Sequence, residues 1–227
     1  MRFLFLFFFL FSNLALAKDP LSEGFLFLEK KDYNRAFSTF STIKKKKPFI
    51  YTAMGISKAL SGDYEKALDF LFIATEDTKE SKNWVPNFFI GFSFYNLNKY
   101  KDAIPFLEKS YSLNQDNETL TLLGKSYFKI ENYKKSEEIL DKIYKEKKDE
   151  EISLLLAKSK ISLNKNTEAE NLLNESITLY PQNPFLLYER AKLRFKNGQI
   201  DLAEKDIEIA ISLSNNPEIQ KIYSSIK

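Results

Sequence analysis

The sequence predicts an all-α solenoid of about six helix–turn–helix units, closed by a capping helix at its C-terminus. All six glycines fall at two positions of a repeat that is about 34 residues long. One position ends with two alanines in place of glycine, and a small residue follows each of its members twelve residues later. These pairs are Gly24–Ala36, Gly55–Ala67, Gly91–Ala103, Gly124–Ser136, Ala157–Ala169 and Ala191–Ala203.

The paired small residues indicate two helices that cross closely within each unit. Bulky residues surround them at helical spacing, and in the fourth unit these give each helix an apolar stripe. The stripes contain Leu120, Leu123 and Tyr127 on the first helix, and Ile139, Leu140 and Ile143 on the second.

The turn between the two helices has its own signal. The other two glycines, Gly62 and Gly198, lie there. In the first four units the turn position reads Lys31, Gly62, Asn98 and Glu131, each followed one residue later by a residue–Tyr pair such as Asp63–Tyr64. Gly and Asn at this place favour a left-handed helix end.

Prolines fit the expected junctions between helices. Pro48 blocks a continuous helix between the first two units, and Pro86 and Pro105 fall early in predicted helices, where a missing N–H is tolerated. A last helix after Pro217 is expected to cover the exposed end of the stack.

This arrangement resembles the tetratricopeptide repeat (TPR), whose unit carries small residues at its eighth and twentieth positions and a large apolar residue at its twenty-fourth. The last of these reads Phe40, Leu71, Leu107, Leu140, Leu173 and Ile207. The early Trp of the family is missing. The resemblance implies a right-handed superhelix with units near 17–47, 48–81, 84–117, 117–150, 150–183 and 184–217, and a cap at 218–227.

The first seventeen residues resemble a secretory signal peptide, and residues 18–227 are then the solenoid. Arg2 is followed by the apolar run 3–11 and by Ala15-Leu16-Ala17. This run is shorter than the roughly 20 residues that span a bilayer. The alternative is an uncleaved anchoring helix. The signal-peptide pattern predicts an exported protein of bacterial type. Because no cysteine is present for lipidation, we expect it to be periplasmic and not a lipoprotein.

Composition narrows the function. The chain has no His and no Cys, which excludes His-based catalysis, thiol nucleophiles and ordinary zinc sites. Every glycine is explained by the repeat, so no phosphate-binding loop is expected. The net charge of +3 gives little attraction for nucleic acid. We therefore expect no enzyme, no cofactor, no metal and no nucleic-acid partner.

The TPR resemblance places a peptide-binding groove along the first helix of each unit. Its upper half is then apolar and its lower half lysine-rich, with Lys125, Lys158 and Lys192 at one repeat position. The alternatives to a binding role are ordinary packing between helices for the aromatic residues and a solvated helix face for the lysines. The groove candidates are Phe25, Ile56, Phe88, Phe92, Tyr95, Lys125, Lys129, Lys158, Tyr188, Lys192 and Lys196.

These features favour an adaptor or scaffold in the bacterial envelope that binds a segment of another protein, with an envelope membrane protein as a further expected associate. The Lys/Asn carboxylate clamp of some TPR proteins is not matched. The alternative function is binding to an anionic polymer or membrane surface through the groove lysines and the junction run 44–47.

Overall fold

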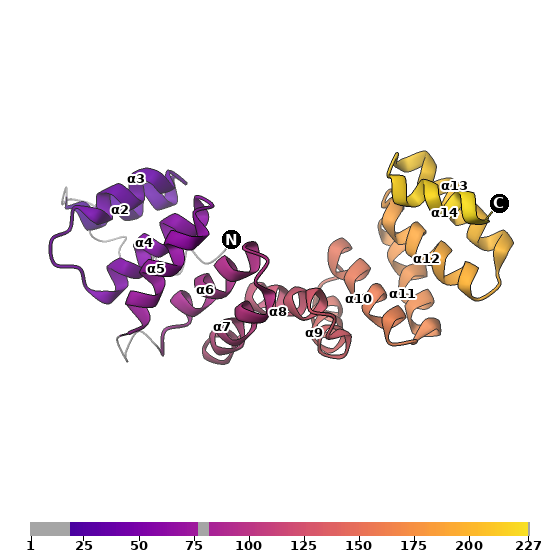
Figure 1. The fold of residues 1–227 in the computed structure, drawn as a ribbon, viewed down its shortest axis with the longest axis horizontal. Coiled ribbons are helices and arrows are strands. Elements are labelled where there is room, and N and C mark those ends of the chain that lie inside the picture. Colours follow the sequence, from indigo (N-terminus) through magenta and orange to yellow (C-terminus); the bar gives the residue numbers. More distant parts are fainter. Residues whose placement is uncertain (1–18, 77–81, 227) are drawn as a thin grey trace. The chain divides into compact units, whose positions relative to one another are not determined.

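The computed structural model describes residues 19–76 and 82–226, and within these residues the regular structure consists of helices in consecutive pairs (Figure 1). The predicted signal peptide lies outside them. The first helices of the pairs are α2 (Pro20–Glu29), α4 (Pro48–Leu60), α6 (Trp84–Asn96), α8 (Asn117–Lys129), α10 (Glu150–Ser162) and α12 (Pro184–Lys196). The second helices are α3 (Tyr33–Ser41), α5 (Tyr64–Thr75), α7 (Tyr100–Leu113), α9 (Tyr133–Glu146), α11 (Asn166–Leu179) and α13 (Ile200–Leu213), and α14 (Pro217–Ile226) follows.

The chain divides into two compact units at Leu122 and Leu123, inside α8. The N-terminal unit ends at Leu122, and the C-terminal unit starts at Leu123. First helices of neighbouring pairs touch within each unit, α4 against α6 in the first and α10 against α12 in the second. Residues at equivalent positions of these helices therefore share one face.

Several first helices begin at a side chain that caps their free backbone N–H groups. The Asp149 carboxylate accepts hydrogen bonds from the backbone of Glu151 and Ile152, and the Asn183 side chain does the same for Phe185 and Leu186. Caps of this kind are typically worth about 1 kcal/mol each. They fix where α10 and α12 begin.

The glycines allow the helices of a pair to approach closely, as the twelve-residue spacing predicted. A Cβ on Gly91 would lie 2.6 Å from Leu107 Cγ and 3.2 Å from the Ala103 carbonyl oxygen. One on Gly55 would lie 2.5 Å from Leu71. The glycine thus makes room mainly for the large residue sixteen positions later, and the small residue twelve positions later brings its backbone close.

The turn residues adopt left-handed backbone in all six pairs. Positive φ occurs at Gly62 and Gly198, and also at Lys31, Asn98, Glu131 and Asn164. The next residue donates back to the carbonyl five positions earlier, as Lys99 N does to Phe94 O at 2.9 Å. This is the Schellman helix ending, so the prediction from Gly and Asn is confirmed, and it extends to a lysine and a glutamate.

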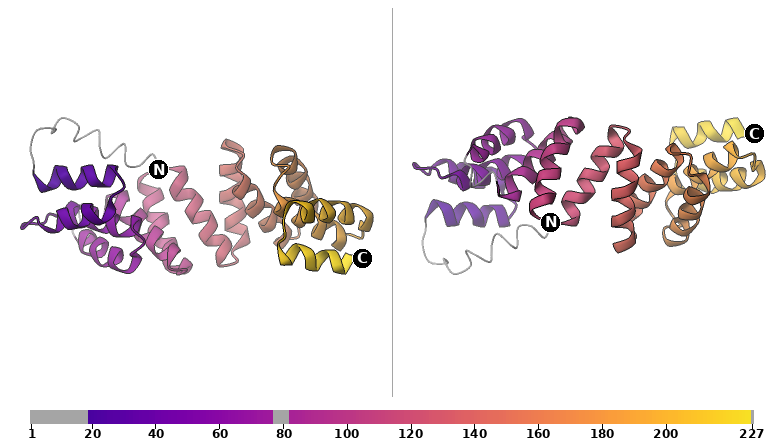
Figure 2. Two further views of the ribbon diagram at one scale, coloured as in Figure 1. Left: turned by 90° about the horizontal axis from the view of Figure 1, so that it is seen from above. Right: turned by 90° about the horizontal axis from the view of Figure 1, so that it is seen from below.

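One prediction about proline is wrong and one about the cap is confirmed. Pro105 is the sixth residue of α7, beyond the first turn, so α7 lacks one of its internal hydrogen bonds. At the other end, α14 lies against α13 and α12 (Figure 2). Ile219 of α14 is completely buried against Leu187 and Ile207, which closes this end of the apolar core.

Candidate functional site

Two of the predicted groove residues in the N-terminal unit belong to the core. Phe25 packs edge-on against Phe40 with ring centroids 5.1 Å apart, and Phe88 stacks against Phe92 at 6.1 Å. Both Phe25 and Phe88 are buried. The packing interpretation therefore applies to them, because a buried ring offers no surface to a partner.

Ile56, Phe92 and Tyr95 are only partly buried. Phe92 meets Tyr64 of the preceding pair at 6.0 Å, and Tyr95 meets Tyr100 of its own pair at 5.2 Å. The exposed parts of these residues remain accessible on the face of α4 and α6. Their main contacts hold adjacent helices together.

In the C-terminal unit the predicted lysine row is a row of ion pairs. Lys125 Nζ lies 2.7 Å from a carboxylate oxygen of Glu151, Lys158 Nζ lies 3.6 Å from Glu189, and Lys192 Nζ lies 3.2 Å from Glu189. We call these residues the lysine face: Lys125, Glu151, Lys158, Glu189 and Lys192. The two glutamates were not among the groove residues that the sequence predicted.

The lysine face presents charges of both signs to solvent. At its α8 end the Lys125 side chain is 19% exposed and its partner Glu151 is 63% exposed. At its α12 end the order is reversed, since the side chains of Lys158 and Lys192 are each 41% exposed and Glu189 is 6% exposed. The outward charge is therefore negative near Glu151 and positive near Lys158 and Lys192.

Aromatic rings border the positive end. Lys192 Nζ lies 5.0 Å from the centre of the Tyr188 ring, and Lys158 Nζ lies 5.9 Å from that of Phe128. Tyr188, one of the predicted groove residues, is buried in the core cluster with Leu187 and Ile219, and burial raises the pKa of its phenol. Phe185 and Phe195 are 39% and 38% exposed.

The sequence spacing of the rings on α12 places them on the same side of the helix as Lys192 of the lysine face. Phe185, Tyr188, Lys192 and Phe195 follow the i, i+3, i+7, i+10 pattern of one helix stripe. Two further predicted residues, Lys129 and Lys196, are exposed four residues after Lys125 and Lys192.

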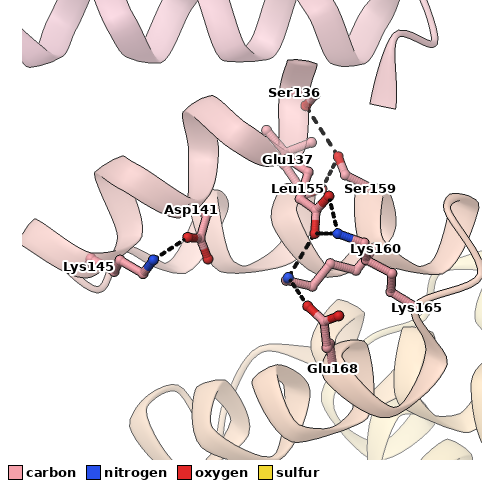
Figure 3. Close-up of polar contacts among 9 residues, drawn as sticks. All are labelled: Ser136, Glu137, Asp141, Lys145, Leu155, Ser159, Lys160, Lys165 and Glu168. Carbon is pink, nitrogen blue, oxygen red and sulfur yellow. Dashed lines mark hydrogen bonds and ion pairs between the residues drawn. The ribbon is translucent and has the colours of Figure 1, made fainter. Parts of the chain in front are cut away.

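A second charged cluster, between α9, α10 and α11, is structural (Figure 3). Glu137 accepts hydrogen bonds from Lys160 at 2.9 Å and from Lys165 at 2.8 Å, and Lys160 also donates to Glu168. Burial opposes the ionisation of Glu137, but the bonds from Lys165 and Lys160 outweigh it and lower its pKa. The charges of this cluster neutralise one another, and Glu137 and Lys160 are largely buried. The cluster therefore connects α9 to α10 and α11 of the next repeat.

The next repeat contains an equivalent cluster. The Arg194 guanidinium donates to Glu170 and to Asp206, both at 2.9 Å, and Arg190 makes two bonds of 2.7–2.8 Å to the Asp206 carboxylate. Asp206 is almost fully buried. These arginines therefore serve packing between α11, α12 and α13.

Two kinds of feature do not occur in the part of the chain that the structure describes. No group of acidic side chains there is arranged to hold a metal ion. None of its helices combines the length and the apolar character needed to cross a membrane. In the junction run, Lys46 turns back to donate to the carbonyls of Ser41 and Ile43.

Solved structures with the same architecture include one described as YrrB, a TPR protein with an unusual peptide-binding site. It matches with a TM-score of 0.73 and 17% identity, over 84% of this chain and 98% of that one. The chain has a tetratricopeptide-repeat fold. The MamA protein of Desulfovibrio magneticus RS-1, residues 41 to the end, is similar to this TPR-fold chain with a TM-score of 0.68 and 17% identity, over 75% and 97% of the two chains.

Two further comparisons agree with the TPR fold. A chain of the APC/C hetero-tetramer Cut9–Hcn1 matches with a TM-score of 0.62 and 18% identity, over 91% of this chain and 42% of that one. The family model for anaphase-promoting complex, cyclosome, subunit 3 matches residues 96–176. The sequence has no significant match among curated proteins.

Proposed function

We propose that this TPR-fold protein is a non-enzymatic adaptor that binds a segment of a partner protein along the first helices of its C-terminal unit. The observation that carries the proposal is the lysine face, where Lys158 and Lys192 are partly exposed and Lys192 shares one stripe of α12 with the exposed rings of Phe185 and Phe195. Aromatic side chains and cations on one stripe suit an extended protein segment. The peptide-binding site named for YrrB, which shares the fold, is consistent with this function.

The alternating charge favours a protein partner over an anionic polymer or membrane. An anionic polymer or membrane is best bound by an unbroken row of positive charges, and the exposed Glu151 carboxylate interrupts the row of lysines. Lys46 donates hydrogen bonds to backbone carbonyls, which makes the junction run 44–47 less suitable as a second site for an anionic ligand.

Export completes the proposal. We propose cleavage after Ala17 and a role in the bacterial envelope, on the strength of the basic start, the short apolar run and the Ala-Leu-Ala end. An envelope membrane protein is a suitable partner, and nucleic acid is not, given the near-balanced charge.

Two matched variants test the function. In the first, Lys158 and Lys192 are changed to Ala; in the second, Lys134 and Lys205, which are exposed on the second helices α9 and α13, are changed instead. Both variants lose two positive charges. Affinity purification from the cells of origin should recover the partners of the wild-type chain with the second variant and lose them with the first.

The same purification at low and high salt separates the alternatives. A segment held by aromatic contacts and few paired charges should lose affinity only gradually as ionic strength rises, whereas an anionic surface that contacts many lysines should be released steeply. Equal losses from both variants, together with steep release by salt, would favour the anionic-surface function.

A further inference from the structure

We infer that Lys158 and Lys192, held by the buried Glu189, form a site for a single carboxylate of the bound segment, and that Lys125 lies outside this site. The inference rests on the proposed function and narrows its ligand chemistry. It starts from a difference within the lysine face that the repeat positions alone do not reveal, because all three lysines are equivalent there.

Glu189 is placed to position two ammonium groups. Its carboxylate is 3.6 Å from Lys158 Nζ and 3.2 Å from Lys192 Nζ, and its side chain is only 6% exposed. The two lysines come from different first helices, α10 and α12, which are in contact. Two like charges that contact one side chain repel each other, and the Glu189 carboxylate offsets this repulsion by attracting both.

The charge count selects the ligand. The two ammonium groups and the Glu189 carboxylate that they contact have a net charge of +1 among these three groups. A carboxylate, with a charge of −1, neutralises the site. A phosphate monoester, at about −1.5 to −2 near neutral pH, would leave an excess of negative charge beside Glu189.

Lys125 differs from the other two lysines because an exposed carboxylate already pairs with its charge. Its ammonium group lies 2.7 Å from a Glu151 carboxylate oxygen that is itself at the surface. An incoming carboxylate would meet Glu151 before Lys125, and like charges repel. Near Glu151 the bound segment should instead be neutral or basic.

The rings around the pair restrict where the ammonium groups lie. Tyr188 and Phe128 lie beneath them, within cation–π range. The exposed ring of Phe195 lies one turn beyond Lys192. A suitable segment therefore has one acidic residue with an apolar residue near it.

The carboxylate could come from an Asp or Glu side chain or from the C-terminus of the segment. The test uses two random hexapeptide libraries, one with amidated and one with free C-termini, and the full chain with three variants. Lys192→Ala removes one ammonium group of the pair. Lys125→Ala is the control with the same charge change. Glu189→Gln removes the buried charge and keeps the size of the side chain.

If the carboxylate belongs to a side chain, the wild-type chain should select peptides with one acidic residue at a fixed position from both libraries. If it is the C-terminal carboxylate, the chain should select peptides only from the library with free C-termini. Lys192→Ala should weaken binding of these peptides about tenfold, the loss of one charge-assisted hydrogen bond. Lys125→Ala should change their binding less than about twofold. Glu189→Gln leaves a net charge of +2, so it should select two acidic groups, a change that mere loss of structure would not produce.

The possible contradictions are distinct. A wild-type consensus without a carboxylate, equal effects of Lys125→Ala and Lys192→Ala, or an unchanged single-acid consensus with Glu189→Gln would overturn this inference and leave the adaptor function standing. Selection of no peptide from either library would overturn the adaptor function as well. If Glu189→Gln does not fold by circular dichroism, Lys158→Ala replaces it, and it should weaken binding as Lys192→Ala does.

Discussion

Glu137 on α9 accepts a hydrogen bond from Lys160 on α10, and one repeat later Glu170 on α11 accepts one from Arg194 on α12, each at 2.9 Å. The same two repeat positions are occupied in the N-terminal unit by Phe37 and Lys58, whose ammonium group lies 4.4 Å from the ring centre. This contact between neighbouring repeats is thus a cation–π contact between the first two repeats and an ion pair at both of these places in the C-terminal unit.

The Glu137–Lys160 pair should be needed for stability. We expect Glu137→Gln to lower the free energy of unfolding by about 2–3 kcal/mol, somewhat less than for a fully buried pair because Lys165 stays partly exposed. Denaturant unfolding measures this. Glu138→Gln, at the exposed neighbouring position, is the control and should change stability by less than about 0.5 kcal/mol. Equal effects of the two variants would show that the ion pair adds nothing.

The same carboxylate makes stability depend on pH. The pKa of Glu137 in the folded chain is lowered from its ordinary 4.5 by the bonds from Lys165 and Lys160, which outweigh burial. Its contribution is therefore complete above pH 4.5 and is lost as the pH falls through the folded pKa. Unfolding of wild type and Glu137→Gln, compared at neutral pH and at acid pH below 4.5, should show the difference between them shrinking. A difference that stays constant would contradict this origin.

Close approach at Gly91 should also be measurable. A Cβ there would lie 2.6 Å from Leu107 Cγ, so Gly91→Ala forces α6 and α7 apart and should cost about 1–3 kcal/mol. Thermal melting followed by circular dichroism tests it. Gly198→Asn is the comparison, because a Cβ added to Gly198 would meet no atom within 4 Å beyond its chain neighbours, and Asn tolerates the positive φ of 75° at this position. An unchanged melting temperature for Gly91→Ala would rule out the tight crossing.

The fold could be predicted from the sequence because the repeat acts locally. Gly91 and Leu107 lie within one helix pair, and Gly62 and Asn98 end their own helices, so a single period specifies them. The lysine face could be predicted only in part. Lys125 and Glu151 are 26 residues apart, and which glutamate reaches which lysine depends on how two pairs pack. Repeat position alone also could not tell that Phe88 would be buried.

Export makes a separate prediction. N-terminal sequencing of the native protein should begin at Lys18, because a signal peptidase cleaves after the small residue Ala17. A chain that still carries Met1 and remains attached to the membrane would favour the anchoring helix. Intact Met1 in the cytosol would contradict export and the envelope role together.

The central claim is that a protein segment lies on the first helices of the C-terminal unit, and photo-crosslinking in the cells of origin tests it most directly. A photoreactive phenylalanine replaces Phe195 on α12 in one variant and Leu179 on α11 in the other, two side chains that are 38% and 47% exposed. We expect a crosslinked partner protein from position 195 and little from the more exposed position 179. Equal crosslinking at both positions, or crosslinking at 179 alone, would contradict the claim.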